Sequence, residues 1–139
     1  MKRIILILAA IACLLSLTAC GRANEEDIRE SIVNKVFVYE KEGFGSDFTI
    51  IINEDGSFSY YEGGLSSYIG VGKWSLDGTT LTLSDGISTN YAFVNHFEVK
   101  DGDLVFIAED STNFLYVKVA DGEHFKYNFD MPDDVLSEK

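Results

Sequence analysis

From residue 35 onward, apolar and polar side chains alternate in short runs, which is the period of a half-buried β-strand. The run "DFTIIIN" (47–53), for example, places Phe48, Ile50 and Ile52 on one face. The alternation predicts strands at residues 35–40, 47–53, 57–61, 73–76, 80–84, 90–100, 103–109, 113–119 and 124–129. The glycine-rich segment 62–72 breaks the alternation, and we expect it to be a long loop.

Five Asp-Gly pairs separate these runs and begin at positions 55, 77, 85, 101 and 121. Asp-Gly suits tight turns that need a positive φ, so it joins neighbouring antiparallel strands. The chain is therefore expected to be mainly β, an antiparallel meander of eight or nine strands over residues 35–130. Such a meander removes its edges by closing into a barrel. An open β-sandwich is the alternative.

Residues 25–34 follow a helical period instead. Asn24 can cap the helix, and three acidic residues follow it in the first turn, where the helix dipole favours negative charge. Ile28, Ile32 and Val33 then fall on one face. The pattern predicts one short helix that packs on the sheet or plugs an end of the barrel.

The first 19 residues have the order of a secretory signal, with a basic start, an apolar run and small residues. "LTAC", ending at Cys20, resembles the lipobox of bacterial lipoproteins. The resemblance implies cleavage before Cys20, diacylglycerol on its thiol and a tether at residues 20–24. We therefore expect a protein that is lipid-anchored on the extracytoplasmic face of the cell membrane. An ordinary signal peptide that happens to contain a cysteine is the alternative.

The charge of the chain excludes some partners. The formal net charge is −12, and loss of Lys2 and Arg3 with the signal would make it −14. Nucleic-acid binding needs basic patches, so we expect no nucleic-acid partner. An acidic domain also stands off anionic lipid. We expect a monomer with an acidic tail at residues 131–139.

A second resemblance lies in the middle of the chain. "GVGKWSLDGTTLTLSDG" (70–86) resembles a hairpin of small lipocalin-like bacterial lipoprotein domains. About residues 36–120 are similar to an extracytoplasmic domain of Firmicutes, found alone on a lipid anchor or fused to membrane zinc metallopeptidases of the β-lactam-sensor type. The resemblance implies a lipocalin-like barrel. The zinc motif His-Glu-x-x-His is absent from this chain, so no peptidase activity carries over.

The sequence offers no catalytic constellation. His96 and His124 lie on different predicted strands, where an isolated histidine is more often a surface residue than half of a site. Acidic segments at residues 53–57, 101–103 and 109–113 group oxygen ligands of the kind that Ca²⁺ uses, but the same residue types favour turns. We expect no enzyme, no cofactor and no metal.

The best candidate for a binding site is aromatic. Tyr60, Tyr61, Tyr68 and Trp74 surround the glycine-rich segment, and aromatic side chains with a polar tip suit ligand binding at the mouth of a barrel. The alternative is that these aromatics belong to the core.

Three functions remain open from the sequence. A non-catalytic domain that binds or senses a small ligand or envelope component predicts a cavity lined by aromatics. A protein-interaction module of an envelope or sensor complex predicts a filled barrel with an exposed apolar patch or open edge. An unrecognised hydrolase predicts converging titratable groups in a cleft.

Overall fold

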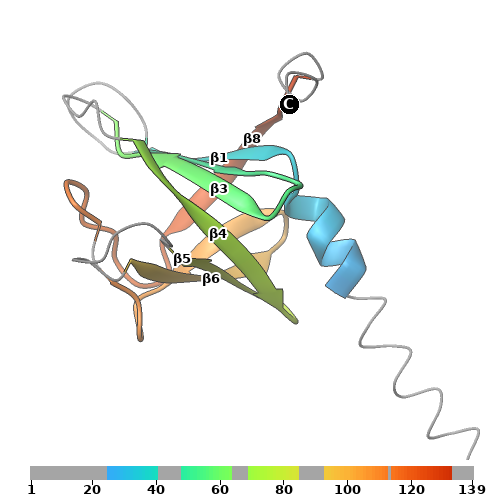
Figure 1. The fold of residues 1–139 in the computed structure, drawn as a ribbon. Helices are drawn as coiled ribbons and strands as arrows, with labels where there is room; N and C mark the ends of the chain where they lie inside the picture. The colour runs from blue at the N-terminus through green and yellow to red at the C-terminus, as the bar shows by residue number, and fades with distance from the viewer. Residues whose placement is uncertain (1–24, 41–47, 64–68, 85–92, 113, 133–139) are drawn as a thin grey trace, which may run out of the picture.

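The computed structural model is a closed antiparallel barrel of eight strands, each paired with its neighbours in chain order (Figure 1). It describes residues 25–40, 48–63, 69–84, 93–112 and 114–132. The meander and its closure confirm the predicted barrel rather than the sandwich. The strands are β1 (Lys35–Tyr39), β2 (Phe48–Ile52), β3 (Ser57–Tyr61), β4 (Ile69–Asp77), β5 (Thr80–Ser84), β6 (Val94–Lys100), β7 (Asp103–Ile107) and β8 (His124–Asp130).

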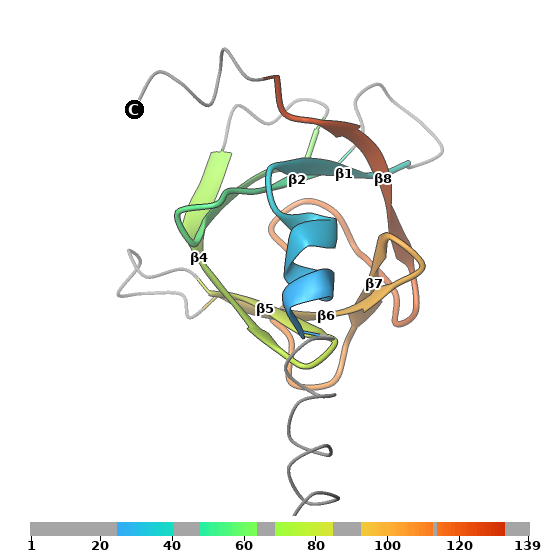
Figure 2. The same ribbon diagram turned by 90° about the vertical axis from the view of Figure 1, so that its right-hand side faces the viewer.

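A short helix (residues 25–32) precedes the barrel, as the sequence predicted, and lies across one end of it (Figure 2). Ile32 is fully buried and joins the barrel core, with Ile28 and Val33 packed against that core. Asn34 then takes a positive φ of 56° and reverses the chain into β1. The backbone N–H of Asn34 donates a hydrogen bond to the backbone carbonyl of Ile52 at 2.7 Å. The helix is therefore a plug for this end.

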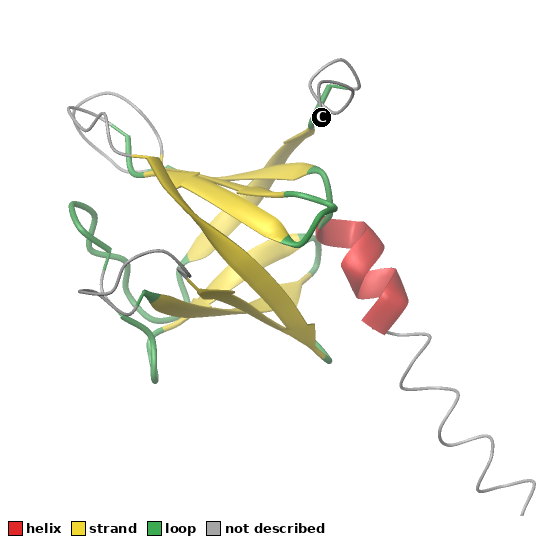
Figure 3. Cartoon of the chain, in the orientation of Figure 1, coloured by secondary structure: helices red, strands yellow, loops and turns green. Residues whose placement is uncertain are grey.

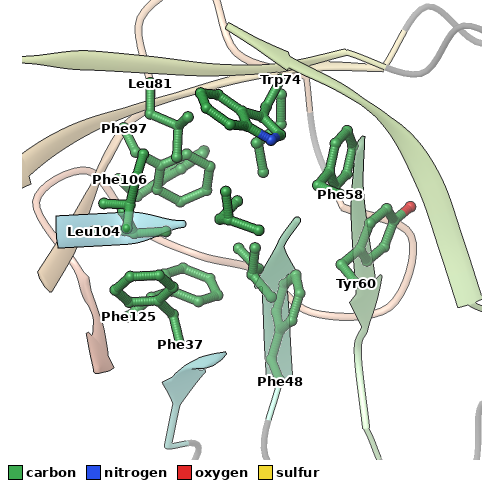
Figure 4. Packing of buried hydrophobic residues seen from close by; sticks show 14 of the residues in the cluster. Phe37, Phe48, Phe58, Tyr60, Trp74, Leu81, Phe97, Leu104, Phe106 and Phe125 are labelled. Carbon is green, nitrogen blue, oxygen red and sulfur yellow. The ribbon is translucent and has the colours of Figure 1, made fainter. Parts of the chain in front are cut away.

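The barrel interior is filled by side chains, most of them aromatic (Figure 4). The phenyl rings of Phe48 and Phe125 meet edge to face with centroids 4.9 Å apart, and Phe125 meets Phe97 in the same way at 5.4 Å. Such edge-to-face pairs are favourable beyond the area they bury. All the described core residues lie within residues 28–125, so a chain that begins at residue 24 keeps every one of them.

The segment 62–72 is not entirely a loop, because β4 already begins at Ile69. Gly70 and Gly72 point into the barrel, directly opposite Tyr60 and Phe58 on β3. A Cβ at Gly70 would overlap the Tyr60 ring, and one at Gly72 would overlap the Ser84 carbonyl oxygen. These glycines of β4 leave room in the barrel interior for the aromatic rings of β3. Only the packed structure distinguishes that role from a flexible loop.

The predicted strand at residues 113–119 is also wrong. Residues 114–119 form bends and irregular chain at the end of the barrel opposite the helix (Figure 3). Phe114 and Val117 turn into the core, while Leu115 and Tyr116 are exposed. The barrel thus has eight strands rather than nine, and this segment, residues 114–119, is a second plug. We call it the distal cap.

The Asp-Gly turns have the backbone that their sequence predicted. Gly56, Gly78, Gly102 and Gly122 all have positive φ, between 59° and 88°, while the pair at 85–86 lies outside the described residues. Within the part of the chain that the structure describes, no helix is long and apolar enough to cross a membrane.

Candidate functional site

The structure separates the four aromatic residues that the sequence grouped. Tyr60 and Trp74 belong to the core, with 5 % and 8 % of their surface exposed. Tyr61 points outward from β3, and Tyr68 lies outside the described residues. The rings of Tyr60 and Phe93 stack with centroids 5.0 Å apart at 8°. Tyr60 and Trp74 therefore hold the barrel together instead of lining an open mouth.

Trp74 connects the helix to the strands at the helix end of the barrel. Its indole N–H donates to the carbonyl of Asn53 at 2.8 Å, and the guanidinium of Arg29 lies over its ring at 4.6 Å. A pocket of about 620 Å³ opens beside this contact, between the helix and β4. Three charged side chains, Glu25, Glu26 and Arg29, line it, and all three residues are exposed.

In contrast to this charged pocket, part of the outer wall of the barrel is mostly uncharged. Two rows of outward-facing residues run across five neighbouring strands, from β8 to β4, and so extend around about half of the closed barrel; together we call them the outer face. The first row is Phe129, Val36, Ile51, Ser59 and Val71. The second row is Lys126, Val38, Thr49, Tyr61 and Ile69.

A β-bulge completes the first row. Val36 pairs with Phe129 and Phe37 pairs with Tyr127, so Asn128 is the extra residue on β8. One extra residue reverses the alternation of a strand. Phe129 is thereby on the outside, opposite Val36, although Phe125 and Tyr127 share the other face. Phe129 is 47 % exposed.

The outer face contains no carboxylate and a single cation, Lys126. This composition is unusual in a chain with 23 acidic and 11 basic residues. Acidic side chains stand around it instead, among them Glu40, Glu54 and Asp130. On the opposite face of β8 from Phe129, desolvation raises the pKa of Tyr127 above its ordinary value of 10.0, and the charge of Asp130 adds to this effect.

Three large apolar residues of the outer face are exposed, and they lie at its two ends: Ile69 (62 %) and Val71 (46 %) on β4, and Phe129 (47 %) on β8, halfway around the closed barrel. Between them, Val36 is only 4 % exposed. Sequence reasoning missed Ile69 and Val71 because they fell in the expected loop. The signal that could have found them is the alternation of Ile69, Gly70, Val71 and Gly72, if glycine is accepted as an inward residue. Phe129 depends on the bulge, which no local pattern announces.

The distal cap is held by one buried carboxylate. Glu62 is 4 % exposed, and its two oxygens accept hydrogen bonds from the backbone N–H groups of Leu115, Tyr116 and Val117 at 2.6–2.9 Å. These three donors lie outside the strands, in the irregular distal cap. Glu62 thus supplies acceptors for them, and sequence reasoning gave it no role.

The histidines and the acidic segments have local partners. His96 bonds to Thr82 at 3.0 Å, and His124 pairs with Asp103 at 3.2 Å. In the segment 53–57, Asp55 accepts from the amide of Ser57 at 3.0 Å, which is the bond of an Asx turn. Among the described residues no three His, Cys, Asp or Glu side chains gather as metal ligands would. Cys20 lies outside those residues.

Comparison with known proteins gives no relative: no family model, no curated protein and no solved structure matches this chain.

Proposed function

We propose that the protein is a lipid-anchored, extracytoplasmic module that binds another protein of the cell envelope through the outer face and catalyses no reaction. Cys20 is the attachment point in this proposal, and the residues after it are the tether. The observation that carries the proposal is the pair Ile69 and Val71, exposed side by side on β4 at the end of a carboxylate-free outer face, on a barrel whose interior is already filled.

Interface chemistry supports this choice. The buried centre of a protein interface is depleted of charged residues and enriched in aromatic ones, as the outer face is. Neighbouring exposed apolar residues, such as Ile69 and Val71 on β4, commonly mark an interaction site. The negative charge elsewhere limits non-specific association, and it favours a partner that carries basic residues around an apolar centre.

Site-specific photocrosslinking in the native cell tests the binding surface. A photoreactive amino acid at Val71 should yield one discrete crosslinked species, and the same amino acid at Glu98, an exposed position on β6, should not. Val71→Asp in a chain crosslinked from Ile69 should abolish the species. Equal crosslinking from Glu98, or a species that survives Val71→Asp, would contradict the proposal. A crosslink to a second copy of the chain would reassign the face to self-association.

The anchor has a separate test. Cys20→Ala should move the protein from the membrane fraction to the soluble fraction and abolish labelling by a palmitate analogue, while Cys20→Ser gives the same result with a closer match in size. Membrane association that persists in both variants would exclude the lipid anchor without touching the outer face.

A further inference from the structure

One buried side-chain atom in the described part of the core, the amide oxygen of Asn95, lacks a hydrogen-bond partner. Asn95 is fully buried and faces inward from β6, on the same face as Phe97 and next in line to Phe93. Its amide nitrogen lies 3.5 Å from the hydroxyl oxygen of Thr112, the outer limit of a hydrogen bond. Its amide oxygen has no hydrogen-bond partner among the described residues.

Exchanging the two ends of the amide does not remove this difficulty. The oxygen would then face Thr112 and the nitrogen would be unpaired, so one polar atom is unsatisfied in either orientation. An unsatisfied buried group is costly, and leucine would fill nearly the same volume without that cost. The amide therefore makes physical sense if something else bonds to it.

Close to Thr112 along the chain, Phe114 places a ring in the core from outside the strands. Phe114 contacts Phe93 at 5.8 Å and Phe48 at 4.7 Å between centroids, and it begins the distal cap only two residues after Thr112. Unlike Phe48 on β2, Phe114 is not on a strand, and the backbone of the distal cap depends on Glu62 for three of its hydrogen bonds. Segments with few ladder bonds open at lower free energy than strands do.

We propose that the space occupied by Phe114 is a binding site for a small apolar molecule of about one aromatic ring that carries a hydroxyl group. The distal cap moves outward with Phe114, the ring of the ligand takes the place of the phenyl group, and the hydroxyl bonds to the Asn95 amide. A hydroxyl both donates and accepts, so it satisfies the amide in either orientation.

The site has a built-in preference. A ligand without the hydroxyl would regain the ring contacts but leave the Asn95 amide unpaired, and a buried polar group that is left unpaired discriminates strongly between analogues. Opening of the distal cap lowers the apparent affinity, because only the open fraction binds. This site is separate from the outer face, so its failure would leave the proposed partner-binding function untouched.

Phenol and toluene are a matched pair of probes, since they differ only in hydroxyl against methyl. The experiment measures both dissociation constants for residues 24–139 by NMR titration. Intermolecular NOEs to Phe93 and Phe106, whose rings lie 5.8 Å and 5.7 Å from the Phe114 ring, locate the ligand. We expect phenol to bind at least tenfold more tightly than toluene, although toluene is the more hydrophobic of the two. Phe114→Ala, which removes the competing ring, should tighten both at least tenfold.

Asn95→Leu is the matched variant, because it keeps the volume and removes the amide. It should reverse the preference in favour of toluene, with its near-ultraviolet circular dichroism unchanged as evidence of folding. Phenol that binds the wild type no better than toluene would overturn the proposal without any variant, as would NOEs from another part of the barrel. Binding only to Phe114→Ala would also overturn it, since the cap of the natural protein would then not open.

Discussion

Single residues decide how the distal end of the barrel closes. Glu62 turns inward at the end of β3 and holds three consecutive amides of the distal cap. A carboxylate can do this because it only accepts hydrogen bonds and offers several lone pairs in one plane. Burial of a carboxylate without hydrogen-bond donors would be costly. The distal cap supplies the donors that Glu62 needs, and Glu62 supplies the acceptors that the cap needs.

Glu62→Gln should therefore destabilise the protein. The glutamine keeps one acceptor oxygen, but it turns an NH₂ group toward backbone donors and loses the charge. We expect the free energy of unfolding to fall by about 2–3 kcal/mol, the range for hydrogen bonds to charged groups. Urea unfolding followed by the fluorescence of Trp74, the one tryptophan of the chain, measures it. The exposed Glu123→Gln is the control, and an equal effect of the two would disprove the role of Glu62.

Gly70 should be as intolerant of a methyl group as a core position. Gly70→Ala pushes a Cβ into the Tyr60 ring, and overpacking of this kind costs about 1–3 kcal/mol. Val71→Ala, on the exposed side of the same strand, should cost less. Tyr60→Leu should make Gly70→Ala better tolerated, so a double-mutant cycle in urea tests the contact directly. Additive effects of the two substitutions would mean that the ring and the glycine do not meet.

At the scale of elements, the helix matters as a plug more than as a helix. With only residues 25–32, it is too short to be stable alone in water. It is stabilised by Ile32 in the core, by Arg29 on Trp74 and by the reversal at Asn34. Its acidic first turn suits the dipole but would not hold it in place.

Ile32→Ala should remove the plug's main contact. Truncation of a fully buried isoleucine costs about 2–5 kcal/mol, and hydrogen exchange should accelerate in residues 25–32 before it does in β5 and β6. Thermal unfolding and exchange mass spectrometry together measure this. Glu30→Ala, exposed on the same helix, is the control. Uniform acceleration over the whole barrel would show that the helix unfolds only with the strands.

At the scale of the whole molecule, the charge is strongly one-sided. With 23 acidic against 11 basic residues, many carboxylates have no cation to pair with. Their repulsion opposes the compact state and keeps the protein soluble. It also makes the carboxylate-free outer face a contrast within the molecule rather than a sample of its average surface.

Salt should stabilise this protein. The Debye screening length shortens from about 30 Å at 0.01 M to about 10 Å at 0.1 M ionic strength, and this weakens the repulsion between distant carboxylates. We expect the Tm at pH 7 to rise by roughly 2–5 °C between 10 and 200 mM NaCl. The same experiment at pH 4, where many carboxylates are protonated, is the control and should show a smaller rise. A Tm that falls with salt at pH 7 would mean that attractive ion pairs dominate.

The sequence by itself determined the strand-rich architecture. Alternation specified most strands to within a residue or two, since a strand with one buried face must place apolar residues at every second position. Asp-Gly specified the described turns because few other pairs adopt a positive φ. The helix followed from its period, although it ends at residue 32 rather than 34.

Tertiary structure decided what those elements do. "NFLYVKV" (113–119) has apolar residues on both faces, so nothing local distinguishes a strand from a cap, and the choice depends on Glu62, more than 50 residues away along the chain. The glycines of segment 62–72 indicate a loop when the sequence is considered alone. In the structure, Gly70 and Gly72 are part of β4 and leave space for the rings of β3. Strand register decides that Tyr60 and Trp74 face inward and that Tyr61 faces outward. One bulged residue on β8 decides that Phe129 faces outward. Local patterns specify elements because their causes are local, whereas the outer face consists of residues that only pairing across five strands brings together.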